Sequence, residues 1–83
     1  MLTAMNDAVV RVMQSHEPST LTIREGGEKG YTLSYEDPIY DPGSLQATGE
    51  TLSRDLPITD VEAAVLIKQG AVYVGAPEKA PYV

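Results

Sequence analysis

The sequence predicts a small α+β domain in which two helices cover a short antiparallel sheet. Two observations predict it. Alternating apolar residues flank a glycine-rich loop within residues 20–35, and apolar residues recur at helical spacing over 3–14 and 60–69. A chain of 83 residues has the length of one domain. We expect residues 1–74 to form it, and residues 75–83, which hold two prolines and no periodic pattern, to form an extended tail.

The first helix is predicted over residues 3–14, where the apolar residues are Met5, Ala8, Val9, Val12 and Met13. Pro18 ends this segment, because a proline disfavours the helical conformation in the residue before it. The only histidine, His16, falls in the exit turn. We interpret it as a polar residue that interacts favourably with the C-terminal end of the helix dipole.

A β-hairpin is predicted over residues 20–35. Leu21 and Ile23 alternate with polar residues in its first strand, as Tyr31, Leu33 and Tyr35 do in its second. Three glycines lie between the strands and can take the positive φ angles that a tight loop requires. The two strands should therefore pair antiparallel and share one apolar face.

Two Asp-Pro pairs within residues 37–43 predict a chain reversal. Residues 44–55 then form either a second hairpin that turns at Gly49 and adds a strand or two to the sheet, or an ordered loop. The reversal also brings together a modest acidic cluster of Glu36, Asp37 and Asp41. Carboxylates are typical calcium ligands, but the spacing of these three does not match the twelve-residue calcium loop, and turn chemistry accounts for them.

The second helix is marked at both ends. Thr59 can accept a hydrogen bond from the amide of Glu62, whose carboxylate can accept one from the amide of Thr59. This capping box starts the helix at Asp60, so that it spans residues 60–69. Gly70 can take the left-handed conformation that ends a helix. Residues 71–74 are then predicted to be a strand.

Residues 56–74 resemble the closing unit of many short tailed-phage proteins. In that unit, a proline-led strand end precedes an acidic helix cap, a pair of alanines, a Leu-Ile pair, a glycine and a last strand that contains alanine. The corresponding residues here are Pro57, Asp60, Ala63, Ala64, Leu66, Ile67, Gly70 and Ala71. The resemblance implies a class, small virion-associated or phage-encoded proteins that work by contact, and it carries over no functional residue.

Composition argues against several classes of function. The net charge of −6 has the wrong sign for nucleic-acid backbones and anionic membranes, and the absence of cysteine removes disulfides, thiolate catalysis and sulfur metal sites. No apolar run approaches the roughly 20 residues of a membrane span. The first residues do not resemble a signal peptide, so we expect a location in the host cytoplasm or the virion.

A single histidine supports neither a nucleophile-base pair nor a zinc site. We therefore expect no enzyme and no cofactor.

All five aromatic residues are tyrosines. A tyrosine has an apolar body and a polar tip, so these rings can either cover the sheet or form an interface. A domain this small hides only about 60–65% of the surface of its unfolded chain, which favours stabilisation by a protein partner or by a homo-oligomer.

We expect a non-enzymatic interaction subunit, such as a head, neck or tail component of a tailed phage. The alternative is an acidic regulator or inhibitor that binds a host protein, with nucleic-acid mimicry as one mode. The residues expected at the interface are Tyr31, Tyr35, Tyr40, Tyr82 and Val83.

Overall fold

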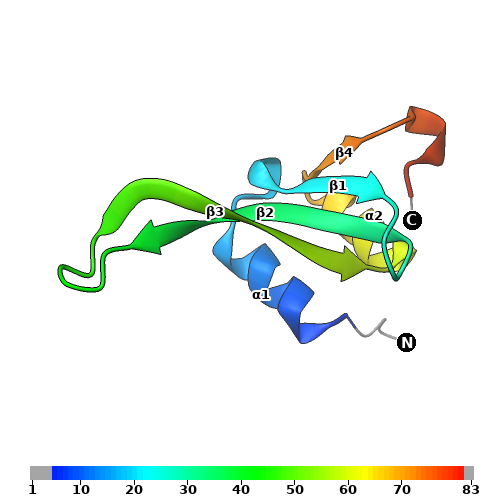
Figure 1. The fold of residues 1–83 in the computed structure, drawn as a ribbon. Coiled ribbons are helices and arrows are strands. Elements are labelled where there is room, and N and C mark those ends of the chain that lie inside the picture. Colours follow the sequence, from blue (N-terminus) through cyan, green and yellow to red (C-terminus); the bar gives the residue numbers. More distant parts are fainter. Residues whose placement is uncertain (1–4, 82–83) are drawn as a thin grey trace.

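The computed structural model describes residues 5–81 and has the predicted α+β class. Its four strands form one sheet in the order β3, β2, β1, β4 (Figure 1). The elements in chain order are α1 (Asp7–Ser15), a 3-10 turn (Pro18–Thr20), β1 (Thr22–Glu25), β2 (Tyr31–Tyr40), β3 (Ala47–Ile58), α2 (Asp60–Lys68), β4 (Val72–Val74) and a second 3-10 turn (Pro77–Lys79).

The sheet is mixed. The hairpin of β1 and β2 is antiparallel as predicted, with Ile23 opposite Leu33. β4, however, runs parallel to β1, with Tyr73 also opposite Ile23, so the sheet is not wholly antiparallel as expected. The reason is the helix between β3 and β4. It carries the chain across the sheet and returns it in the original direction, as a crossover connection does.

Both helices cover the same face of this sheet, because α1, α2 and the strands contribute to a single buried cluster. At its centre, Ile23 and Leu33 are fully buried, which confirms the predicted apolar faces of the hairpin. The buried residues of the cluster are Val9, Val12, Leu21, Ile23, Leu33, Ile58, Ala63, Leu66 and Ala71. Within residues 5–81, neither helix is long and apolar enough to cross a membrane.

Helix α1 begins at Asp7 and not at residue 3, where the sequence predicted its start. Asn6 has an extended backbone, and its side chain accepts a hydrogen bond from the amide of Ala8 at 2.8 Å. Asparagine is strongly favoured at the N-cap position. The prediction followed the spacing of the apolar residues instead, and so placed the start of the helix too early. The first two residues of the predicted range lie outside the described residues.

The possible extension of the sheet within residues 44–55 is confirmed, because β3 lies there, but the prediction of a second hairpin that turns at Gly49 is wrong, and so is the alternative of a loop. β3 continues from Ala47 to Ile58 and pairs with β2 along most of its length. Gly49 has a φ of 91° and lies in a bulge, where β3 carries extra residues between its pairs with β2. The glycine therefore accommodates a bulge instead of a turn.

The predicted reversal at residues 37–43 is placed too early. Pro38 remains in β2, paired with Thr51, and the chain turns beyond it, where the amide of Leu45 donates to the carbonyl of Asp41 at 2.7 Å. Pro38 is tolerated because β1 pairs with β2 only over residues 31–34. At Pro38, β2 is paired with another strand on one side only. A proline, which lacks the amide hydrogen, is tolerated in such a half-open stretch.

Helix α2 starts at the predicted Asp60 with the predicted caps and ends at Lys68, one residue before the predicted end. The hydroxyl of Thr59 accepts from the amide of Glu62 at 3.2 Å, and the carboxylate of Glu62 accepts from the amide of Thr59 at 2.9 Å. At the other end, Gly70 has a φ of 116°. The amides of Gly70 and Ala71 each donate to carbonyls of the last helical turn at 3.0 Å, the pattern of a Schellman motif.

Glu62 also connects the two helices. Its second carboxylate oxygen accepts from the amide of Asn6 at 2.9 Å, and the side chain is nearly fully buried. Burial alone would raise the pKa of Glu62. The amides of Thr59 and Asn6, the Thr59 hydroxyl and the positive charge of Lys29 outweigh burial and hold the pKa below its ordinary value.

We expect Glu62→Gln to lower the free energy of unfolding at neutral pH by about 1–3 kcal/mol, because a carboxamide cannot accept hydrogen bonds at both of its terminal atoms. A lowered folded-state pKa gives stability that is complete above the ordinary pKa of 4.5 and is lost as the pH falls through the folded-state value. The difference between the two proteins should therefore shrink in acid. Urea unfolding across this pH range measures it, with the exposed Glu28→Gln as control; a difference independent of pH would contradict the account.

We expect Gly70→Ala to lower the free energy of unfolding by about 1–2 kcal/mol, because a residue with a Cβ is strained at positive φ. The added carbon would also lie 3.3 Å from Cβ of Pro18. Gly43→Ala is the matched control, since Gly43 lies in an exposed turn and its φ is outside the left-handed region. Equal losses in the two variants, measured by urea unfolding, would show that the cap of α2 does not require glycine.

Candidate interaction surface

The hairpin of β2 and β3 extends well past the helices (Figure 1). We call residues 36–53 the arm. Apart from Asp37, every residue of the arm is exposed. Its large exposed apolar side chains are Ile39, Tyr40, Leu45 and Leu52, with Leu45 at 79% and Tyr40 at 59% exposure. The arm therefore presents apolar groups on a strand pair that has no helix beneath it.

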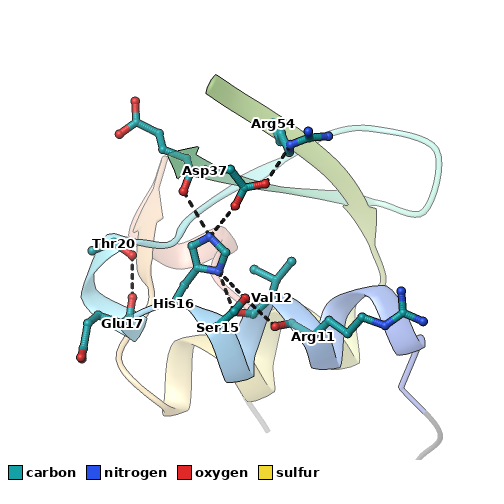
Figure 2. A network of polar contacts seen from close by, with 9 residues as sticks. Arg11, Val12, Ser15, His16, Glu17, Thr20, Asp37 and Arg54 are labelled. Atoms are coloured by element: carbon teal, nitrogen blue, oxygen red, sulfur yellow. Dashed lines mark hydrogen bonds and ion pairs between the residues drawn. The ribbon is translucent and has the colours of Figure 1, made fainter. Parts of the chain in front are cut away.

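His16 joins the end of α1 to the base of the arm (Figure 2). Its Nδ1 atom lies 3.0 Å from the carbonyl oxygen of Val12. On the opposite side of the ring, Nε2 lies 3.0 Å from Oδ1 of Asp37 and 3.1 Å from the carbonyl oxygen of Glu36. The histidine side chain is only 13% exposed, so the ring acts as a mostly buried bridge between helix and strand.

Asp37 extends this bridge to β3. Its second carboxylate oxygen accepts from Nε of Arg54 at 2.8 Å, so one carboxylate connects α1, β2 and β3. The ring of Tyr35 packs edge-on against that of His16, with centroids 5.2 Å apart. Since Arg54 is about half exposed, its ion pair contributes only about 0–1 kcal/mol. The mostly buried histidine is the stronger part of the network.

The same network brings a serine, an imidazole and a carboxylate into line, because Oγ of Ser15 lies 2.9 Å from Nδ1 of His16. Such a line serves acyl transfer in hydrolases. Here the hydroxyl of Ser15 donates to the carbonyl of Arg11 at 2.7 Å, inside the helix. The negatively charged intermediate of such a reaction at Ser15 would also lie near the carbonyl end of α1. The negative end of the helix dipole would destabilise that charge. The arrangement is suited to holding the helix against the arm.

The acidic cluster divides into separate roles. Asp37 is engaged by His16 and Arg54, whereas Asp41 accepts a hydrogen bond from the amide of Gly43 at 2.8 Å, which confirms its predicted role in the turn. Across the part of the chain that the structure describes, no three or more His, Asp or Glu side chains are grouped to hold a metal ion. The cluster therefore does not form one continuous acidic site.

The structure separates the five residues expected at an interface. Tyr40 is on the exposed arm, whereas Tyr31 and Tyr35 are half-buried and pack against the core on the face that the helices cover. The hydroxyl of Tyr31 donates to the carbonyl of Lys79 at 3.2 Å and so fastens the tail segment to β2. Tyr82 and Val83 lie outside the described residues. The interface role of all five stays a prediction.

No sequence pattern indicated the residues that fix the arm. His16 and Asp37 are 21 positions apart, and Asp37 and Arg54 are a further 17 apart. Only the register of β2 and β3 brings Asp37 and Arg54 together, and that register was not predicted. The one available signal was a polar alternation in residues 50–54, too weak to distinguish a strand from a loop.

We expect His16→Phe to lower the free energy of unfolding by about 1–3 kcal/mol. A phenylalanine ring keeps most of the volume, but the carbonyls of Val12 and Glu36 and one carboxylate oxygen of Asp37 lose their polar contacts with the imidazole. In the variant, β2 amides beyond Tyr35 should exchange faster than they do in the unsubstituted chain, whereas β2 amides before Tyr35 should change less. Hydrogen exchange with residue resolution measures both effects, and Glu17→Gln at the neighbouring exposed position is the control. Unchanged exchange in the arm would show that the network does not fix it.

Comparisons with protein-family models, with curated protein sequences and with solved structures gave no match. The resemblance of residues 56–74 to a closing unit of tailed-phage proteins therefore stays a prediction. The arm and the network that holds it are the features of the molecule that indicate a function.

Proposed function

We propose that the chain works by protein-protein contact, without catalysing a reaction, as one of several copies in a larger assembly. The observation that carries this proposal is the exposure of Ile39, Tyr40, Leu45 and Leu52 on one projecting arm. Exposed apolar groups gathered in one region typically mark a site of interaction. Tyrosine and large aliphatic side chains are also well suited to the centre of an interface, where truncation of an anchor costs about 2 kcal/mol or more.

The setting we propose is a tailed-phage particle, in which the chain is a small head, neck or tail component. It would then occur in the host cytoplasm during assembly and in the virion afterwards. The support is the resemblance of residues 56–74, where the capped helix α2 leads directly into the edge strand β4. The proposal involves no cofactor and no direct contact with nucleic acid or membrane, in keeping with the net charge of −6.

Contact through the arm is apolar in this proposal, which distinguishes it from charge mimicry by an acidic inhibitor. Asp37 is paired with Arg54 and therefore contributes little free negative charge to the arm. Binding dominated by Tyr40 and Leu45 should change little with salt, whereas binding by an acidic patch should weaken steeply.

Mass spectrometry of purified particles from a lysate that produces this chain tests the setting, and absence of the chain would overturn it. We expect Tyr40→Ala and Leu45→Ala to reduce incorporation at least tenfold with little change in melting temperature, because both side chains are exposed in the free chain. Val61→Ala, an exposed apolar position on α2, is the matched control. Equal incorporation of all three variants would argue against contact through the arm.

A further inference from the structure

We propose that β3 pairs antiparallel with β3 of a second copy around a two-fold axis at Leu52, which joins two four-stranded sheets into one. The inference rests on the proposed function, since it names a second copy of this chain as the first partner of the arm. It assigns the contact to one sheet edge and to one register.

The edge of β3 is open to pairing. β3 is the outer strand of the sheet next to β2, and residues 47–55 within it are all exposed. An outer strand presents unpaired backbone donors and acceptors that fit another extended chain. The opposite edge, β4, has only three residues and offers a much shorter ladder. The stretch of β2 that β1 leaves unpaired is interrupted by Pro38, which cannot donate a hydrogen bond. β3 is therefore the edge on which a stable addition can form.

The side chains of β3 are complementary to themselves in one register. With the axis at Leu52, that residue lies opposite its own copy, and Glu50 lies opposite Arg54 on both sides of the axis. Directly opposed side chains of opposite charge stabilise an antiparallel pair, and like charges destabilise it. Residues 50, 52 and 54 also share one face of the strand, because side chains alternate.

Neighbouring registers lack this match. An axis at Ser53 would place Leu52 opposite Arg54, and an axis at Arg54 would oppose two arginines. An axis at Glu50 would oppose two glutamates. Charge and apolar contact therefore both select the axis at Leu52, which is 47% exposed in the single chain.

Arg54 can make this contact and keep its ion pair within the chain. Its Nε atom binds Asp37, on the neighbouring strand β2, at 2.8 Å. A guanidinium group has five N–H donors, so its terminal nitrogens remain able to bind Glu50 of the second copy. The residue that determines the register would thus also belong to the network that holds the arm to α1.

The ends of the proposed ladder are limited by the bulge at Gly49 and by Pro57, which cannot donate a hydrogen bond. Pairing is therefore centred on residues 50–54 of each copy. So short a ladder predicts a dimer that dissociates on dilution, with its register fixed by side chains.

Sedimentation of the full chain over a concentration series is the first test. We expect a monomer-dimer equilibrium whose dissociation constant rises at least tenfold in Glu50→Lys, because each lysine would oppose an arginine. Glu28→Lys makes the same change in net charge on the distant hairpin loop and should leave the equilibrium unchanged. A monomer at all concentrations, or equal effects of the two substitutions, would overturn the proposal.

Disulfide cross-linking tests the register, and the chain is suited to it because it has no cysteine. Opposed residues have Cβ atoms about 5 Å apart, close enough to bridge after small shifts. We expect Leu52→Cys to cross-link with itself, and an equal mixture of Thr51→Cys and Ser53→Cys to cross-link between the two variants. Ser53→Cys alone should not. Because successive pairs alternate between narrow and wide, one of the two probes samples a narrow pair. Cross-linking of Ser53→Cys alone in preference to the others would reject the axis at Leu52.

The outcomes separate this inference from the proposed function. A chain that remains monomeric and still enters particles through Tyr40 and Leu45 would overturn the pairing of β3 and leave the proposed function intact. A chain that cross-links in the expected register but is absent from particles would support the pairing and overturn the proposed setting.

Discussion

A single buried carboxylate fixes the arrangement of both helices. Glu62 accepts hydrogen bonds from the amides of Asn6 and Thr59, which are the N-cap residues of α1 and α2. The N-termini of two helices, each positive because of its dipole, therefore meet at one negative group. Since α2 is also fixed by the turn that leads into β4, this contact sets where α1 begins on the sheet. His16, at the other end of α1, then reaches Asp37 at the base of the arm.

The arm depends on the rest of the molecule for its order. Beyond Tyr35, β2 pairs only with β3, and no residue of the arm belongs to the buried cluster. A two-stranded ribbon alone is marginally stable in water. The polar contacts of His16 and Asp37 therefore hold the part of the arm nearest the helices. The free energy needed to open the β2–β3 pairing locally should decrease toward Leu45. A surface of this kind can adjust to a partner while its base stays in place.

The sequence was most informative where local chemistry decides the structure. The capping box at Thr59, the glycine after α2 and the apolar alternation of β1 and β2 each depend on residues close together in the chain, and each was predicted. The course of the long strand β3 was not predicted because residues 47–55 are exposed and mostly polar, with a glycine at position 49, so the alternation was too weak to fix a strand. The parallel pairing of β4 and the meeting of His16, Asp37 and Arg54 follow from tertiary contacts, which no local pattern encodes.

The position of β4 beside β1 has a consequence for biosynthesis. β1 spans Thr22–Glu25, yet its neighbour on one side is supplied by Val72–Val74, which lie much later in the sequence. During translation, β1 therefore keeps an uncovered flank until residues 72–74 have left the ribosome. Prematurely terminated chains that end before residue 72 would expose this flank, which makes them candidates for aggregation or proteolysis and ties stable accumulation to synthesis past β4.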